Sequence, residues 1–219
     1  MSTNSVRPRP PRLPSELEQA QGGALGHDAT FSDVGLSDVA WADQLAGGVR
    51  LEAVRLVNGD LSGAQLEKLR LDDCELTRCE LANLQGRGTQ ATRVMVQESR
   101  LTGIALPEGS LRDLLVRGCR VDLASFGFAE LVRVTFEDCL ITETSFLGAR
   151  LEGVRFQRCD LTRADLREAS LQRCEFSRCE LTGLQGVAQL RGAAVDKAGI
   201  VANADLWAAA LGITVLDPD

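Results

Sequence analysis

The sequence has no tyrosine, and only 4 % of its 219 residues are aromatic. Globular cores usually rely on large aromatic side chains, so this core has to be built from smaller and more regularly placed residues. A single histidine, His27, leaves no basis for a histidine-dependent catalytic triad or metal cluster. The 21 glycines are scattered and form no phosphate-binding fingerprint. These absences predict a protein that is not an enzyme and that holds no cofactor or metal.

Long apolar runs and an excess of basic residues are also absent. No apolar run approaches 18 residues, which predicts no membrane span, and residues 1–14 lack the apolar stretch of a secretory signal. The 24 basic and 31 acidic residues give a net charge of −7, which argues against direct binding of nucleic acid. Seven cysteines without an export signal predict reduced thiols and a cytoplasmic location.

What the sequence has instead is a period of five. From Phe31 to Leu181 every fifth residue is a centre, and every centre is bulky and apolar except Ala46, Gly86 and Ala91. The position two before each centre is usually small or apolar, and all seven cysteines occupy it. A period of five fits neither a helix nor a strand, so the chain must turn at every repeat. Two inward residues in each five predict a tight coil whose sides are one pentapeptide long.

Three segments carry a resemblance to a known family. Residues 159–163 (CDLTR), 164–168 (ADLRE) and 179–183 (CELTG) resemble the pentapeptide-repeat family, whose consensus is A-(D/N)-L-x-x. The resemblance covers roughly residues 29–186, and it implies an all-β fold, a right-handed quadrilateral parallel β-helix with four repeats per coil. We therefore expect about eight coils, with like residues stacked at the strand spacing of about 4.8 Å.

The cysteines support this coil length independently, because Cys119, Cys139, Cys159 and Cys179 recur at a spacing of twenty. The column admits packing, metal ligation or disulfide bonding. We favour packing, because a buried thiol behaves as a small apolar group and metal ligands must converge on a point rather than form a line.

The N-terminal end is expected to differ from the coils. Residues 1–14 are rich in proline and arginine and predict a disordered or extended tail. Residues 15–28 are expected to form a short helix that caps the first coil, because Ser15–Glu18 matches a capping box.

Residues 187–219 predict a helical cap at the other end of the coils. Helices are expected over residues 196–203 and 204–211, with Gly212 as a stop and a short strand over residues 213–216. The apolar residues of this segment favour either end-capping alone or capping together with a homodimer contact. They are Leu206, Trp207, Leu211, Ile213 and Leu216.

Two outward surfaces are candidates for partner binding. The column that starts at Trp41 carries seven acids and three bases. It is either a binding surface for a partner or simply a charged face in contact with solvent. Its acids are Asp43, Asp60, Glu80, Asp122, Glu143, Asp160 and Glu180. The second surface is an exposed apolar patch, unless a local kink turns some of its members inward. It consists of Leu123, Phe128, Leu140 and Leu147.

Residues 86–95 contain two weak centres, which predicts a loose or irregular coil.

The resemblance implies two hypotheses for function. Some family members mimic duplex DNA and bind DNA gyrase, a type II topoisomerase, which they protect from quinolones or inhibit. The acidic column, the negative charge and a dimer-forming C-terminus fit that role, although the loops that interrupt the repeats of the quinolone-resistance members are missing here. The alternative is a protein-interaction scaffold with no link to DNA topology.

Overall fold

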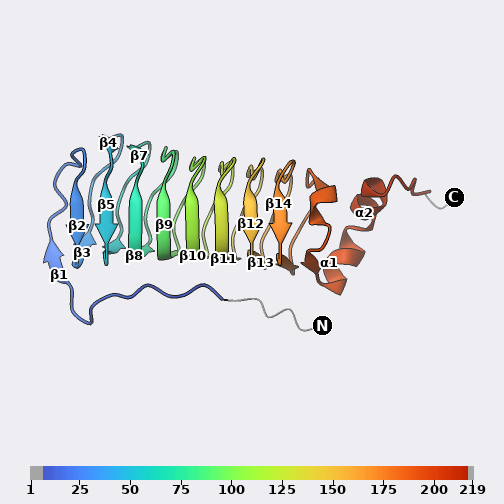
Figure 1. Cartoon of the computed structure of the whole chain (residues 1–219), viewed down its shortest axis with the longest axis horizontal. Helices are drawn as coiled ribbons and strands as arrows, with labels where there is room; N and C mark the ends of the chain where they lie inside the picture. Colours follow the sequence, from blue (N-terminus) through green and yellow to red (C-terminus); the bar gives the residue numbers. More distant parts are fainter. Residues whose placement is uncertain (1–6, 217–219) are drawn as a thin grey trace.

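The chain winds into a parallel β-solenoid of about nine turns with short helices at its C-terminal end (Figure 1). The structure, a computed structural model, describes residues 7–216. It confirms the solenoid predicted from the period of five.

The strands form rungs spaced by twenty residues. In four central rungs one strand of eight residues runs around a corner; these are β8 (Arg70–Thr77), β9 (Gln90–Gln97), β10 (Ser110–Arg117) and β11 (Glu130–Glu137). Elsewhere the same span is split in two, into β2 (Thr30–Ser32) and β3 (Val34–Ser37), β5 (Arg50–Glu52) and β6 (Arg55–Val57), β12 (Arg150–Glu152) and β13 (Arg155–Gln157), and β14 (Ser170–Gln172) and β15 (Glu175–Ser177). Rungs along this stack pair in parallel and join residues twenty apart, as Phe136 with Phe156.

The solenoid has four sides, which we number by their first centres: side 1 begins at Phe31, side 2 at Leu36, side 3 at Trp41 and side 4 at Ala46. Sides 1 and 2 contain the rungs named above. Side 3 is held by single bridges such as Asp60 with Glu80. Side 4 contains β4 (Leu45–Gly47) paired with β7 (Gln65–Glu67), followed by single bridges.

The corners lie two residues after each centre. Their backbone is left-handed, with φ of 53° at Asp38 and 57° at Phe128. For a residue other than glycine this conformation costs roughly 1–2 kcal/mol. Hydrogen bonds between rungs offset the strain, as where the Asp38 N–H donates to the Val57 carbonyl at 3.0 Å. The corners therefore persist because each is tied to the next rung.

The predicted centres form the core. All are buried except four, which are half-buried and pack against the others: Phe31, Leu71, Leu106 and Leu171. In the C-terminal half the phenylalanines stack from rung to rung: the rings of Phe136 and Phe156 lie 5.3 Å apart at 4°. Offset-stacked aromatic pairs add about 0.5–1.5 kcal/mol beyond the burial of their area.

The coil with the weak centres is regular. β9 pairs along its whole length with both β8 and β10, so residues 86–95 form no loose or irregular turn. The interior of the N-terminal half holds a void of about 80 Å³, which is lined by apolar residues from Leu25 to Phe136 and by Thr89, and Ala91 of this coil is one of them. The axis is thus not completely filled.

A strand, not a helix, covers the first coil. β1 (Glu18–Ala20) pairs in parallel with β3, so the capping helix predicted over residues 15–28 is wrong. The open edge of β3 presents unpaired backbone groups, which a strand satisfies directly and a helix does not. The indole N–H of Trp41 also donates to the Gly23 carbonyl at 2.6 Å, which ties the following segment to the end of the core.

Residues 7–14 are extended and lie along the outside of the solenoid (Figure 1). The sequence left a disordered or an extended tail open over residues 1–14, and the extended form holds for this part, while residues 1–6 lie outside the described range. Prolines preset the extended backbone, which lowers the entropy lost on docking.

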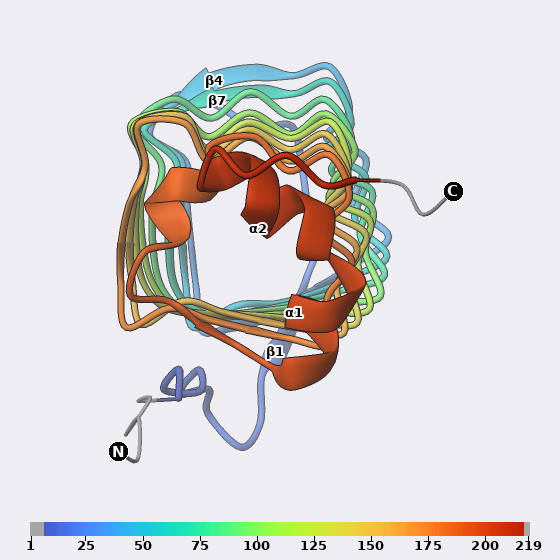
Figure 2. The ribbon, with the colours of Figure 1, turned by 90° about the vertical axis from the view of Figure 1, so that its right-hand side faces the viewer.

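The C-terminal helices lie across the open end of the solenoid (Figure 2). After η1 (Val187–Leu190) and β16 (Ala194–Val195), which pairs with β15, come α1 (Lys197–Ala202) and α2 (Ala204–Ala210). Both predicted helices form, and Gly212 follows α2 with φ of 71°. Asp196 caps α1 by accepting the Gly199 N–H at 2.7 Å. The strand predicted over residues 213–216 does not form.

Candidate partner-binding surfaces

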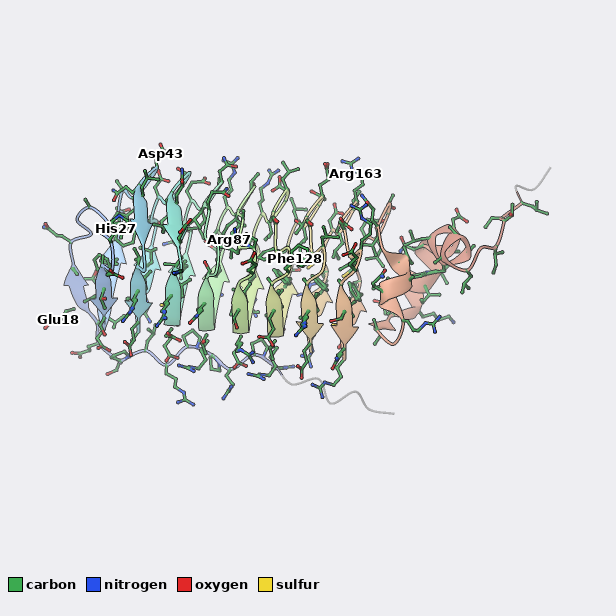
Figure 3. All side chains as sticks on the ribbon, turned by 45° about the horizontal axis from the view of Figure 1, so that its top comes forward. Glu18, His27, Asp43, Arg87, Phe128 and Arg163 are labelled. Atoms are coloured by element: carbon green, nitrogen blue, oxygen red, sulfur yellow. The ribbon has the colours of Figure 1, made fainter. Side chains whose placement is uncertain are left out.

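Side 3 carries the predicted acids, in three rows rather than one. Asp60, Glu80, Asp160 and Glu180 belong to the row of residues that bridge successive rungs. Asp122 lies two positions further along its own rung, and Asp43 and Glu143 occupy corners with positive φ. Figure 3 shows Asp43 toward the N-terminal end of the rod. The structure thus brings the seven acids to one side without aligning them in a single column.

The carboxylates of the bridging row are held in fixed positions by their own rungs. Asp60 Oδ1 accepts the Ser62 N–H at 3.0 Å, and Asp160 Oδ1 accepts the Thr162 N–H at 2.9 Å. Glu180 Oε1 accepts both the N–H and the hydroxyl of Thr182. These Thr182 hydrogen bonds lower the pKa of Glu180 against the opposing effect of burial. Each of these three acids therefore closes a turn, and Glu180 stays ionised.

The bridging row has no acids in the middle of side 3. Between Glu80 and Asp160 the bridging row carries Arg100, Arg120 and Leu140. Asp122 also lies here, where burial opposes its ionisation but hydrogen bonds from Thr102 and Arg120 still hold its pKa below the ordinary value. The acids of the bridging row consequently fall into two blocks, Asp60 with Glu80 and Asp160 with Glu180, separated by a mixed segment of the row.

The predicted apolar patch lies beside this middle segment. Leu123, Phe128 and Leu140 are exposed, Phe128 by 62 %, and Leu147 is half-buried. No kink turns them inward, because the bridges that the structure describes in this region are regular. Leu140 lies on side 3, Leu123 at the corner of sides 3 and 4, Leu147 on side 4, and Phe128 at the corner of sides 4 and 1. Figure 3 shows Phe128 between Asp43 and Arg163 along the rod.

Phe128 rests on the backbone of the next rung. A Cβ placed at Gly148 would lie 2.5 Å from Phe128 Cε1, so only glycine leaves room for the ring there. Gly148 also has φ of 64°. The ring is thus supported by the neighbouring rung while its outer surface stays open to solvent.

The predicted dimerisation residues of the C-terminal segment fall into two groups, one packed against the core and one exposed. Leu206 and Trp207 are half-buried and pack against the core of the solenoid. Leu211, Ile213 and Leu216 are exposed. Sequence reasoning did not single out three further exposed apolar residues here, which are Ile200, Val201 and Val215. The segment therefore caps the core with one face and presents apolar surface on the other.

The thiols and the histidine are engaged within the fold. All seven cysteines are free and buried, and burial raises the pKa of the Cys74 thiol to about 12. His27 Nδ1 accepts the Gly47 N–H at 3.0 Å. Within residues 7–216, no group of three or more His, Cys, Asp or Glu side chains is placed to hold a metal ion.

Among the same residues there is no helix with the length and apolar character that crossing a bilayer requires.

The chain matches one family model and several solved structures. Residues 117–185 match the model described as Pentapeptide repeat region. HetL, a pentapeptide repeat protein involved in heterocyst differentiation regulation from the cyanobacterium Nostoc sp. strain PCC 7120, is similar at 19 % identity over 81 % of this chain and 86 % of its own, with a TM-score of 0.39. A trypsin-treated variant of QnrB1, a plasmid-mediated fluoroquinolone resistance protein, is similar at 18 % identity over 93 % of this chain and 100 % of its own, with a TM-score of 0.37.

A third similar structure is the pentapeptide repeat protein Rfr23 from the cyanobacterium Cyanothece 51142, at 13 % identity over 65 % of this chain and 88 % of its own, with a TM-score of 0.22. No curated protein matches the chain. The matched repeat region lies inside a register of five that runs without a break from Phe31 to Leu181 and folds into four-sided rungs. The chain therefore contains a pentapeptide repeat region.

Proposed function

We propose that this protein is a non-catalytic binding protein that occupies the duplex-DNA-binding surface of a type II topoisomerase such as DNA gyrase. The observation that carries this proposal is the layout of side 3 and its corner with side 4. Two acidic blocks flank an exposed apolar centre formed by Leu123 and Leu140. An apolar centre with a charged rim is the common anatomy of protein interfaces.

The interior supports binding rather than catalysis. Catalytic sites are concave and bring polar groups together. The interior void is lined by apolar residues and Thr89, whose hydroxyl already donates to the Gly86 carbonyl at 2.6 Å. The charged groups described above lie on the outside, so the chemistry that this protein offers is that of its surface.

The acidic blocks suit a basic partner surface. Successive carboxylates lie about 4.8 Å apart along the rod, compared with about 3.4 Å between phosphates along one DNA strand. Because the turn hydrogen bonds hold Asp60, Asp160 and Glu180 in place, little side-chain entropy is lost when a basic partner binds. The gap from Glu80 to Asp160 spans four rungs, roughly 19 Å.

A supercoiling assay with purified gyrase, with and without a quinolone, tests the proposal. The matched variant replaces Asp60 and Asp160 with Asn, and Glu80 and Glu180 with Gln. The amide oxygens still accept the turn hydrogen bonds, so the fold is kept while four charges are removed. We expect inhibition or protection by the wild-type protein and at least a ~10-fold weaker effect of the variant. No effect of micromolar wild-type protein on gyrase would exclude this partner.

The exposed ring of Phe128 favours a second function, a protein-interaction scaffold without a link to DNA topology. This ring is 62 % exposed, is held against Gly148 and lies at the far corner of side 4, away from the acidic blocks. Exposed aromatic anchors often dominate interface energy. A Phe128→Asp variant that loses its partners while the charge-neutralised variant keeps them would favour the scaffold, and the reverse would favour the topoisomerase.

We also propose that two copies associate through the exposed face of the C-terminal segment. Leu211, Ile213 and Leu216 are exposed beside a cap that already covers the core. Sedimentation of the wild-type chain should give a dimer, and Leu211→Glu with Leu216→Glu should give a monomer with an unchanged circular dichroism spectrum. A wild-type monomer at high micromolar concentration would contradict this.

A further inference from the structure

The corner between sides 1 and 2 carries an alternation of charge that the proposed function does not use. Asp73, Arg93, Asp113 and Arg133 occupy this corner in four successive rungs, and we call them the charged corner. Arg93 pairs with Asp73 through two contacts of 2.5 Å. Arg133 pairs with Asp113 through contacts of 2.6 and 2.7 Å. The side chain of Asp113 is completely buried.

The N-terminal strap, residues 7–12, lies on this corner and runs along the rod from its middle back toward the first coil (Figure 1). The Arg12 N–H donates to Asp73 Oδ1 at 2.9 Å. The Arg9 N–H donates to Asp113 Oδ1 at 3.2 Å, and Arg9 Nε donates to Asp113 Oδ2 at 3.0 Å. Residues far apart in the sequence thus meet on two carboxylates of the same corner.

The repeat of the strap matches the repeat of the solenoid. Asp73 and Asp113 are two rungs apart, which is roughly 9.6 Å at the spacing between neighbouring strands. Arg9 and Arg12 are three residues apart, which is roughly 9.3 Å in a polyproline II helix. That helix has three residues per turn, so both backbone N–H groups face the same way. The prolines at positions 8, 10 and 11 favour this conformation.

The contact is selective but small. Asp113 is enclosed between Arg133 of its own corner and Arg9 of the strap. Burial opposes its ionisation, but the hydrogen bonds from Arg133 and Arg9 outweigh burial and hold its pKa well below the ordinary value. Beside the corner, a space of about 290 Å³ remains between the strap and side 2, next to Met95, Leu115 and Thr135. A few charged contacts therefore hold the strap, and no close-packed core resists its exchange.

We propose that the charged corner is a recognition site for extended arginine–proline peptides and that residues 7–12 are its intramolecular ligand. A partner is recognised when its polyproline II segment presents an arginine to Asp113 and a backbone N–H to Asp73 three residues later. Such a segment has to displace the strap, whose tether gives it an effective concentration in the millimolar range. The site is on a different side of the rod from the surface proposed above and does not depend on it.

The full-length chain allows a direct test by charge reversal in the strap. Arg9→Glu places a carboxylate against Asp113 and should release the strap without touching the solenoid. The matched control is Arg7→Glu, which makes the same charge change at a residue with no ion pair to any of residues 7–216. The circular dichroism of both variants should equal that of the wild type.

The first measurement is tryptic cleavage of the bond between Arg12 and Leu13. Trypsin does not cut before proline, so this is the one bond after an arginine in residues 7–14 that it can cut. We expect cleavage at least ~10-fold faster in Arg9→Glu than in the wild type, and unchanged in Arg7→Glu. Equal rates in the wild type and Arg9→Glu would overturn the proposal.

The second measurement is binding of a fluorescein-labelled peptide with the sequence of residues 7–14, followed by anisotropy. The peptide should bind the Arg9→Glu chain at least ~100-fold more tightly than the wild type, whose site is filled by its own strap. Adding Asp113→Asn to the Arg9→Glu chain should abolish binding. The proposal is overturned if Arg9→Glu fails to bind the peptide or if Asp113→Asn has no effect. A wild-type dimer that Arg9→Glu converts to monomers would assign the site to the strap of a second copy and overturn intramolecular occupancy.

Discussion

Filling the interior void should stabilise the protein, and Ala91 is the position to fill it from. Ala91 is buried, lines the void and lies between Leu71 and Leu111 in neighbouring rungs. Ala91→Leu restores the aliphatic ladder and adds three carbons, each worth about 0.8 kcal/mol when buried. Fixing the leucine rotamer costs about 0.5–1 kcal/mol. We expect a net gain of about 1–2 kcal/mol in the free energy of unfolding.

The size of the void sets an upper limit on this gain, because its lining extends from Leu25 to Phe136 and Ala91→Leu fills only part of it. The whole volume of about 80 Å³, at roughly 24 cal/mol for each Å³, corresponds to about 2 kcal/mol. The control is Ala164→Leu, because Ala164 is completely buried and does not line the void. There the larger side chain has no space, and overpacking should destabilise the protein by about 1–3 kcal/mol.

Urea denaturation followed by circular dichroism and by tryptophan fluorescence, to which both Trp41 and Trp207 contribute, measures both variants. With a typical urea dependence, Ala91→Leu should raise the midpoint by about 0.5–1 M and Ala164→Leu should lower it. If Ala91→Leu lowers the midpoint as Ala164→Leu does, the rung holds no usable space and the reasoning about the weak centres is refuted.

Three further predictions concern the core. Leu161→Asp buries an unpaired carboxylate and should destabilise the rod by several kcal/mol, whereas Thr162→Asp on the outside should change stability by less than ~1 kcal/mol; equal melting curves would contradict the inward register. Phe156→Ala removes a ring stacked on both neighbouring rungs and should cost about 3–5 kcal/mol in urea denaturation, and a loss below ~1 kcal/mol would show that the stack adds little. The seven thiols should react with Ellman's reagent only after denaturation, because all of them are buried and the reagent cannot reach them; rapid reaction of the native protein would show that they are accessible.

The coils could be predicted from the sequence because one period specifies both the corners and the inward residues. Every fifth residue faces inward, so the stacking of Phe136 on Phe156 followed from their spacing of twenty. The buried cysteines followed from the same register. A repeat that never slips leaves no other alignment of one rung on the next, and this is why the core residues were identified without any structure.

The weak coil was misjudged because side chains were given more weight than backbone. Hydrogen bonds between rungs join main-chain groups and do not depend on the size of the centre, as where the Gly86 N–H donates to the Ala105 carbonyl at 2.8 Å. The rung therefore keeps its shape when its centre is small. The missing volume becomes a void instead of a bend.

The N-terminal segment was hard to predict because local signals compete with a distant surface. The capping box at Ser15–Glu18 favours a helix on its own, but the edge of β3 offers unpaired backbone groups. The strap meets Asp113 across 104 positions of sequence, and its role depends on the alignment of the rungs. The signal was present all the same, as two arginines three residues apart among prolines and two aspartates forty residues apart. The match between the strap and the charged corner can be recognised only when the spacing of the rungs is compared with the rise of a polyproline II helix.

The surface was harder to predict than the core. Counting the charges of a whole column treats bridging positions and corner positions as equivalent, although they have different structural roles. Of the three outward residues in each repeat, one bridges to the next rung and one turns the corner. A carboxylate in the bridging row closes a turn and stands in fixed geometry, as Asp160 does, whereas one at a corner, as Glu143, pairs with the arginine of the next rung. The pairing of Glu143 with Arg163 neutralises this corner, whereas among the described acids of the bridging row only Glu80 has an ion pair, with Arg100 at 3.6 Å. Any resemblance of side 3 to a charged duplex must therefore come from the bridging row, and substitutions in that row, rather than at the corners, should decide whether a basic partner binds.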